Sequence, residues 1–296
     1  MLPERPRIGF VGFGAMAHRY AGIFGQAEQP PAMVAYCNGQ RNRPPYTAAF
    51  RERAREVGVT LVDTPPELAA ASDVILSLVT PAAALQSAQE MSPFLTAQHL
   101  YADMNNVSPK VMVEAARLCE SRGALFVDAA VPAPGLVAGA GAEGYQRLFA
   151  SYGIEVDVVE GPPGAAKTVK LIRSILMKGI IALLWEMAET AHKAGLDGQV
   201  RKHAVEWMDG WKFSDFANRL TCTAGLHAQR RAEEMVDVLD LQRELGIEPV
   251  LPLATYDKFL QMAALNLKDH FDVFDPPTDY LQMIRALDTL PADQAR

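Results

Sequence analysis

The first half of the chain alternates short apolar runs with stretches of helical periodicity. Apolar runs with the length and β-branched content of strands cover 7–11, 33–37, 74–79, 99–104 and 125–131. Between them, the pattern predicts helices at about 15–24, 47–56, 82–91 and 109–122. The continuous apolar run at 74–79 is typical of a strand that is buried on both faces. This alternation predicts an α/β fold with a doubly wound parallel sheet.

The pattern changes after the Gly/Pro cluster at 161–164, because no further strand is predicted beyond it. A long helix is expected over 165–194, closed by Gly195, and shorter helices at about 196–207, 226–245, 252–264 and 278–287. Glycine is common just past a helix end because it adopts the left-handed backbone conformation there. We therefore expect an α/β domain over 1–164 and an all-α domain over 165–296, which begins with a long interdomain helix.

Composition narrows the class of protein. The 296 residues carry 28 Lys+Arg against 35 Asp+Glu, a formal net charge of −7, which argues against a nucleic-acid partner. Cys37, Cys119 and Cys222 are far apart and form neither a disulfide framework nor a zinc motif, so we expect a reducing compartment and no metal. The longest apolar stretch, 175–184, is too short for a membrane span and contains Lys178. These features predict a cytoplasmic protein with no membrane partner.

A glycine loop follows the first predicted strand and opens the first helix. Gly12-Phe13-Gly14-Ala15-Met16-Ala17 fits the pattern G-x-G-x-x-G/A. In this context the first glycine makes a tight turn and the second lets the backbone approach a pyrophosphate. The free N–H groups at the helix start favour phosphate. The loop predicts a dinucleotide-binding (Rossmann) domain; a merely tight strand–helix turn is the alternative.

The end of the second predicted strand bears on the choice of dinucleotide. Sites that prefer NAD usually have Asp or Glu there, to accept hydrogen bonds from the adenosine ribose. Here the position holds Asn38, and Arg41 and Arg43 follow. The two arginines are suited to pair with a 2′-phosphate, which favours NADP(H) over NAD(H). The alternative is that both are solvated loop charges.

Four segments in this order resemble one family: the glycine loop, 103–109 (DMNNVSP), 127–131 (VDAAV) and 161–170 (GPPGAAKTVK). The chain resembles the β-hydroxyacid dehydrogenases, whose relatives include 3-hydroxyisobutyrate and 6-phosphogluconate dehydrogenases and the imine reductases. The segments 170–186 and 227–235 are similar to the branch with a phosphogluconate-dehydrogenase-like C-terminal domain, which threonate dehydrogenases resemble. The resemblance implies hydride transfer between a nicotinamide and a small hydroxyacid or its carbonyl counterpart.

The resemblance also implies a catalytic lysine, which in the family follows glycines nine, six and four residues earlier. Lys170 has Gly161 and Gly164 at the first two positions and Ala166 at the third. Lys167 fits less well, so we expect it to be a surface charge. Where the family has Asn four residues after the lysine, this chain has Ser174.

Helical spacing places Lys170, Arg173, Ser174 and Lys178 on one face. As a general acid/base, Lys170 would exchange a proton with the substrate oxygen, and neighbouring positive charges would favour an anionic substrate. The alternative is a row of surface charges over a buried apolar back. Lys170 and Ser174 are the predicted catalytic residues.

The remaining candidates follow predicted strands or match family segments. Beyond the glycine loop and the 38–43 segment, Val79, Thr80 and Asn105 are expected to contact the cofactor. Ser108 is also placed to cap the helix that begins at Pro109. The 132–134 segment, Pro-Ala-Pro, replaces the family's Ser-Gly-Gly substrate loop. The expected substrate contacts are Asn106, Ser108, Val131, Pro132, Ala133, Arg173, Lys178, His227 and Arg231. For His227 and Arg231, surface salt bridging along one helix is the alternative.

We therefore predict an NADP-dependent oxidoreductase for a small, anionic hydroxyacid or its carbonyl. An imine reductase is the second enzyme class, and Lys170 counts against it because imine reductases often lack the lysine. A non-catalytic NADP(H)-binding sensor or scaffold is the alternative outside the enzymes. By resemblance, the helical C-terminal domain is expected to form a homodimer.

Overall fold

The computed structural model describes residues 2–39, 42–131 and 135–290. These fall into two compact units, Met1–Ile175 and Leu176–Arg296, each described here by itself. The units meet inside a long helix, α7 (Ala165–Lys193), whereas the sequence placed the domain boundary at the start of that helix. The last strand does end before residue 164. The predicted boundary and the observed one therefore differ only in whether the first turns of α7 belong to the first domain or to the second.

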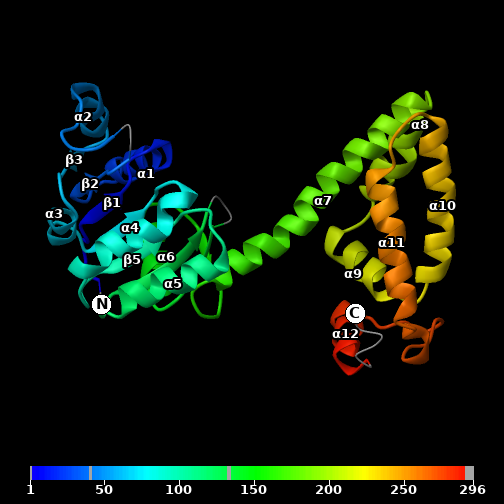
Figure 1. Cartoon of the computed structure of the whole chain (residues 1–296). Coiled ribbons are helices and arrows are strands. Elements are labelled where there is room, and N and C mark those ends of the chain that lie inside the picture. Colours follow the sequence, from blue (N-terminus) through cyan, green and yellow to red (C-terminus); the bar gives the residue numbers. More distant parts are fainter. Residues whose placement is uncertain (1, 40–41, 132–134, 291–296) are drawn as a thin grey trace. The chain divides into compact units, whose positions relative to one another are not determined.

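One sheet forms the framework of the first unit. Its eight strands run in the order β3-β2-β1-β4-β5-β6-β7-β8. Figure 1 labels four of them, β1, β2, β3 and β5. Every neighbouring pair is parallel except β6 and β7, which are antiparallel. The strands are β1 (Ile8–Val11), β2 (Met33–Tyr36), β3 (Val59–Leu61), β4 (Val74–Ser77), β5 (Leu100–Asp103), β6 (Leu125–Ala130), β7 (Gly135–Ala138) and β8 (Val156–Val158).

Helices cover both faces of this sheet, as the sequence predicted. On one face Phe24, Phe50 and Phe149 pack on strand residues such as Phe10; they come from α1 (Ala15–Gly25), α2 (Ala48–Arg55) and α6 (Ala142–Ala150). On the other face Leu68, Met91 and Met112 join a cluster that contains strand residue Tyr101; they come from α3 (Pro65–Ala70), α4 (Ala84–Met91) and α5 (Pro109–Glu120). The sheet is therefore doubly wound.

The strand order reverses between β1 and β4, both neighbours in the sheet. In doubly wound sheets, ligands bind beside such a switch point, at the carboxyl ends of the parallel strands. The loops that follow β1, β4, β5 and β6 all leave from this edge, which we call the ligand edge. Because β7 runs antiparallel to β6, its carboxyl end lies at the opposite edge.

The second unit consists of helices, as predicted. After α7 come α8 (Asp197–Val200), a π-helical turn (Arg201–Glu206), α9 (Phe213–Ala224), α10 (Ala228–Glu244), α11 (Val250–Ala264) and α12 (Tyr280–Ala286). Gly195 and Gly246 follow α7 and α10 with φ of 69° and 72°, which confirms both as helix ends. Within the described residues, none of the helices is long and apolar enough to cross a membrane.

Several short elements were not predicted, namely β3, α3, β7, α6, β8 and α9. The first five are short or, as around 139–144, rich in glycine, so their sequences carry little periodic signal.

Candidate active site

The glycine loop lies between β1 and α1 with the geometry that a bound pyrophosphate requires. Gly12 has φ of 84°, and a Cβ there would lie 2.5 Å from the carbonyl oxygen of Leu78. At Gly14 a Cβ would have no neighbour within 4 Å, so open space lies in front of this backbone. Among the described residues, the amides of Ala15 and Met16 donate to no backbone carbonyl outside the helix. Free amides at a helix start beside open space fit a bound phosphate group.

Two side chains of the loop differ in their placement. Met16 is 39% exposed in the first turn of α1. Phe13, by contrast, is buried and packs edge-on against Phe10 and Phe50. The expectation that Phe13 contacts the cofactor is therefore limited to its backbone, because its ring belongs to the core.

The end of β2 is held by a tyrosine. The hydroxyl group of Tyr46 accepts a hydrogen bond from the amide of Cys37 at 3.1 Å and donates to the carbonyl oxygen of Val62 at 2.9 Å. Asn38 and Arg43 follow, and both are exposed. Arg41, the third residue predicted to select NADP(H), lies outside the described residues. The side chains of Asn38 and Arg43 are thus available to a ligand at the ligand edge.

Asn105 is buried and its side chain is hydrogen-bonded within the protein, while its predicted contact with the cofactor stays a prediction. Its Oδ1 accepts from the amide of Val79 at 2.7 Å, while its Nδ2 donates to Ser77 Oγ and to Asp103 Oδ1 at 3.0 and 2.9 Å. Only 4% of Asn105 is exposed. With both amide donors used, it joins the ends of β4 and β5. Thr80, which follows Val79, is exposed and makes no cap bond to the next helical turn.

Lys170 lies at the ligand edge, on the second turn of α7. Its Nζ donates to Asn106 Oδ1 at 3.0 Å and to the carbonyl oxygen of Val131 at 3.1 Å. Asn106 follows β5 and Val131 follows β6, so the lysine joins two strand ends. Three residues that the sequence singled out separately are therefore brought together.

The other predicted catalytic residue, Ser174, turns back on its own helix. Its hydroxyl donates to the carbonyl oxygen of Lys170 at 3.0 Å. Ser108 precedes α5 with an extended backbone but makes no side-chain cap bond, so its exposed hydroxyl remains available. Arg173 lies half-buried on α7. Pro132 and Ala133 lie outside the described residues.

Lys178, His227 and Arg231 belong to the second unit. Arg231 Nη2 donates to Thr223 Oγ1 at 3.1 Å. Burial, followed by the charge of Arg231, lowers the pKa of His227. Arg230 and Lys268 also lower the pKa of His227. His227 therefore lies among three cationic side chains, Arg230, Arg231 and Lys268, at the start of α10. Lys178 is exposed on α7.

Lys167 contradicts its prediction as a surface charge. Its side chain is 1% exposed, and its Nζ lies 3.3 Å from Oδ1 of the fully buried Asp128. Neither Asp128 nor Asp103, which pairs with it in register across β5 and β6, is singled out by the sequence patterns. Burial raises the pKa of Asp103 to about 6. The signal for both is a carboxylate within an otherwise apolar strand, at the last residue of β5 and at the fourth of the six residues of β6.

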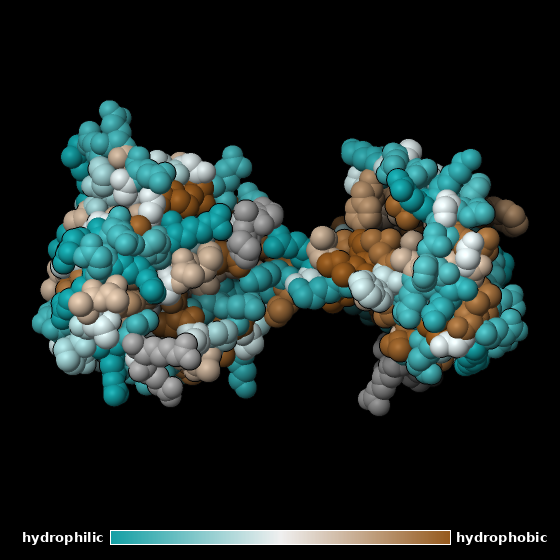
Figure 2. Space-filling model, turned by 90° about the horizontal axis from the view of Figure 1, so that it is seen from above, coloured by the Kyte–Doolittle hydropathy of each residue, from teal (hydrophilic) through white to brown (hydrophobic). Residues whose placement is uncertain are grey.

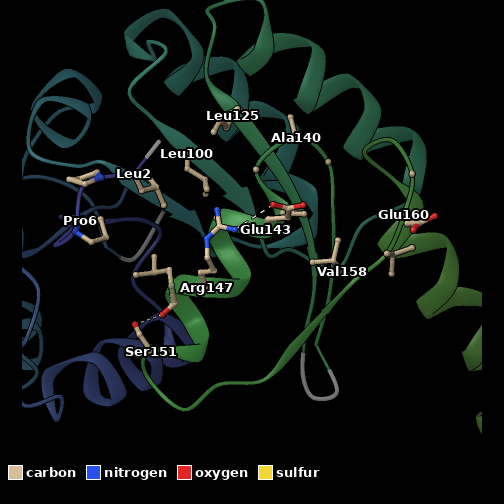
Figure 3. A pocket seen from close by; sticks show the side chains of 18 of the residues that line it. Leu2, Pro6, Leu100, Leu125, Ala140, Glu143, Arg147, Ser151, Val158 and Glu160 are labelled. Atoms are coloured by element: carbon tan, nitrogen blue, oxygen red, sulfur yellow. Dashed lines mark hydrogen bonds and ion pairs between the residues drawn. The ribbon is translucent and has the colours of Figure 1, made fainter.

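Two cavities lie at different places on the first unit. One of about 520 Å³ borders the ligand edge and is lined by residues that include Met16, Arg19 and Val131. The other, of about 530 Å³, lies beside α6 at the opposite edge (Figure 3). Glu4, Glu143 and Glu160 line the second cavity, and its Arg147 is paired with Glu143 at 3.4 Å. These carboxylates disfavour an anion there.

Two family models match the chain. The NAD binding domain of 6-phosphogluconate dehydrogenase matches residues 7–143, and a domain of unknown function, DUF1932, matches residues 191–261. Together they cover strands β1 to β7 and a large part of the second unit.

Solved structures resemble the chain over most of its length. The conserved protein MTH1747, described as similar to 3-hydroxyacid dehydrogenases, is 31% identical, with 86% of this chain and 96% of that chain covered and a TM-score of 0.58. A conserved hypothetical protein from Sinorhizobium meliloti is 28% identical, with coverage of 95% and 96% and a TM-score of 0.60. An imine reductase from Myxococcus stipitatus is 16% identical, with coverage of 87% and 93% and a TM-score of 0.70, a likeness of fold alone.

Proposed function

Since this chain belongs to the β-hydroxyacid dehydrogenase family, we propose that it uses NADP(H) and acts on a small, anionic hydroxyacid or the corresponding carbonyl. The chain is an oxidoreductase with an NAD(P)-binding domain of the hydroxyacid dehydrogenase type. The single observation that carries the proposal is Lys170, whose Nζ is held at the ligand edge by Asn106 and Val131.

Lys170 is the proposed general acid/base. A bound NADP(H) supplies or accepts the hydride. In reduction, Lys170 donates a proton to the carbonyl oxygen of the substrate; in oxidation, it takes the proton of the substrate hydroxyl. Asn106 and the carbonyl of Val131 orient the ammonium group toward that oxygen. The cations Arg173 and Lys178 on α7 support an anionic substrate, because they would attract its carboxylate or phosphate.

Two exposed parts of the first unit, the glycine loop and the residues that follow β2, support dinucleotide binding. The amides of Ala15 and Met16 and the space in front of Gly14 suit a pyrophosphate. The exposed Asn38 and Arg43 carry no negative charge that would repel a 2′-phosphate. We therefore propose NADP(H) rather than NAD(H) as the preferred cofactor.

Replacing Lys170 with Ala tests the proposed acid/base. We expect turnover to fall by about 10²- to 10⁴-fold, the usual contribution of a positioned acid/base, with little change in NADPH affinity. Steady-state rates with hydroxyacids, semialdehydes and cyclic imines, alongside NADPH fluorescence titration, provide the measurement. Lys193→Ala, an exposed position on the same helix, is the control. Near-normal turnover of Lys170→Ala would remove the assignment.

The cofactor preference is tested at the end of β2. In the Asn38→Asp/Arg43→Ala variant a carboxylate replaces the amide and one cation is lost. We expect the ratio of the NADPH and NADH dissociation constants to shift toward NADH by about tenfold or more, because the new charge repels the 2′-phosphate. An unchanged ratio would mean that neither residue faces the adenosine ribose.

Imine reduction is the second candidate function, because it is carried out by relatives that the sequence resemblance includes. The same panel separates the candidates: turnover of cyclic imines but no hydroxyacid or semialdehyde would favour it. Binding of NADPH with no turnover of any compound would favour a sensor or scaffold.

We further propose that the protein acts as a homodimer through its second unit. Large apolar side chains on α7 of that unit are exposed, and Figure 2 shows hydrophobic surface gathered on this unit. Ile181 and Trp185 are 66% and 76% exposed. Apolar area of this extent marks an interaction surface, and a two-fold pair of identical chains is the commonest assembly. Light scattering after size-exclusion chromatography should give twice the chain mass; a monomer mass would contradict this.

A further inference from the structure

Lys167 is a lysine with almost no exposure to solvent. Its Nζ donates to the carbonyl oxygen of Ala129 and lies 3.3 Å from Asp128 Oδ1. As the third residue of α7, it also lies at the helix end where the backbone carries partial positive charge. Burial lowers its pKa, which reflects the cost of keeping an ammonium group there. An exposed position would avoid these costs, so the placement calls for another explanation.

Asp128 fixes the start of α7 from the sheet. Its Oδ2 accepts hydrogen bonds from the amides of Gly164 at 2.9 Å and Lys167 at 3.2 Å. Such bonds are usually made by a side chain at the residue before the helix, but that residue is Gly164, which has none. The cap therefore comes from the end of β6, and the carboxylate is fully buried.

The same strand end also holds Lys170. Its Nζ donates to the carbonyl oxygen of Val131, while that of Lys167 donates to Ala129. Ala129 lies in β6 and Val131 directly follows it, and both lysines lie in the first two turns of α7. Contacts that hold the start of α7 against β6 therefore also keep Lys170 within hydrogen-bonding distance of the carbonyl oxygen of Val131.

Asp103 links this cluster to the second acceptor of Lys170. It pairs in register with Asp128, and its Oδ1 accepts from the backbone and side-chain amides of Asn105 at 2.8 and 2.9 Å. The next residue, Asn106, provides Oδ1 to Lys170. The positive charge of Lys167 favours the ionised form of Asp103 against the effect of burial. One ammonium group thus balances two carboxylates that fix both strand ends around Lys170.

We propose that Lys167 and Asp128 are positioning residues that hold the start of α7 against β6 and so fix Lys170 at the reaction site. The inference rests on the function proposed for Lys170 and adds two residues that touch neither substrate nor cofactor. Stability alone is a weak explanation of the pair, because a well-packed apolar pair often stabilises a protein as much as a buried ion pair.

The first variant is Lys167→Met, which keeps the length of the side chain and removes its charge and hydrogen bonds. We expect kcat to fall about tenfold or more through misplacement of Lys170, with the KM for substrate and the affinity for NADPH little changed. The high-pH limb of the pH–rate profile should move to higher pH, because a positive neighbour has been lost. Lys193→Met, exposed on the same helix, is the matched control.

A second measurement does not depend on turnover. Trinitrobenzenesulfonate labels the unprotonated amine of lysine, and mass spectrometry of the peptide that contains Lys170 gives its labelling rate over a series of pH values. The limiting rates at high pH are compared, because there a change in the pKa of Lys170 no longer affects the rate. If Lys167 holds the helix start, Lys170 should be labelled several-fold faster in Lys167→Met than in the wild type or in Lys193→Met. An unchanged labelling rate overturns the proposal, whatever the loss of thermal stability, because a merely structural role leaves Lys170 in place.

The outcomes separate this inference from the proposed function. Faster labelling in the variant, with no wild-type turnover of any compound in the panel, would support the positioning role and remove the proposed reaction. Should Lys167→Met fail to fold, Asp128→Asn is used, which keeps the shape of the side chain but replaces the charged acceptor of the α7 amides and of Lys167 with a neutral one. Its labelling rate should rise in the same direction, and an unchanged rate would overturn the proposal equally.

Discussion

The first unit contains two strand–loop–helix segments with almost the same glycine pattern. Gly12–Ala17 joins β1 to α1, and Gly139–Gly144, with the sequence GAGAEG, joins β7 to α6. The first glycines behave alike: Gly12 and Gly139 have φ of 84° and 98° and lie close to a neighbouring carbonyl oxygen. Both glycines therefore serve the turn itself.

The second glycines differ. A Cβ on Gly14 would meet nothing within 4 Å, whereas a Cβ on Gly141 would lie 2.7 Å from Val127 Cγ2. The amide of Gly141 also donates to the carbonyl oxygen of Phe126 at 3.0 Å, and that of Ala142 to Gly139 at 3.0 Å. One loop keeps its backbone open to a ligand, while the other uses its backbone to pack on the sheet. The same short pattern thus serves binding in one place and packing in the other.

The two edges also differ in buried charge. Asp103, Asp128 and Lys167 all lie at the ligand edge, and they are the buried charged side chains of the described residues. At the opposite edge, the cavity of Figure 3 is lined by carboxylates and lies beside the second glycine loop. The ligand edge therefore combines an open glycine loop with buried carboxylates whose charge a buried lysine offsets. Neither feature alone identifies a binding edge.

Replacing the first glycines should give the largest effect and tests what the loops share. Gly12→Ala and Gly139→Ala place a Cβ 2.5 Å from Leu78 O and 2.8 Å from Phe126 O, respectively. We expect each to lower the free energy of unfolding by about 3–5 kcal/mol, since left-handed strain and overpacking add. Chemical denaturation measures this. A Gly139→Ala protein as stable as the wild type would show that the second loop does not need its glycine.

The pH dependence of stability sharpens the contrast between the edges. The pKa of Asp103 is about 6 in the folded protein and lower when unfolded, so the folded state binds its proton more tightly. Raising the pH from about 4 to about 7 should therefore lower the free energy of unfolding, by up to about 3 kcal/mol from this group. Urea denaturation of the wild type and Asp103→Asn at both pH values gives the difference. A difference independent of pH would contradict the raised pKa.

The second glycines should separate the two loops most cleanly, with the smallest changes. Gly141→Ala should cost about 2 kcal/mol of stability, because Val127 must move, and leave NADPH affinity of the folded protein unchanged. Gly14→Ala should change stability by less than about 0.5 kcal/mol and weaken NADPH binding about tenfold, because its Cβ would enter the space for the pyrophosphate. Denaturation and fluorescence titration measure the two effects. If Gly14→Ala lowered stability and Gly141→Ala weakened NADPH binding, the second loop and not the first would be the binding loop.

Much of the fold and part of the site could be predicted from the sequence. Apolar runs such as 74–79 and the glycines after α7 and α10 carry local signals, because strand burial and helix ends depend on nearby residues. Lys170 is predicted from the family resemblance, through the spacing from Gly161 and Gly164 that the family requires. Lys167, by contrast, is buried and not the surface charge that its sequence position predicts. The sequence does not reveal this, because its partners Asp128 and Ala129 lie on a strand distant in sequence.

Local patterns in the chain predict the alternation of strands and helices, the helical second half and the glycine loop after β1, because periodicity and turn chemistry act within short windows. The position of the catalytic lysine follows from the family resemblance. The folded arrangement alone shows that Gly14 is open while Gly141 is packed, and that Asp103, Asp128 and Lys167 share one buried cluster. It does so because burial and charge pairing depend on which strands are neighbours and in which direction each runs. The reversal at β7 alone moves the second glycine loop away from the ligand edge.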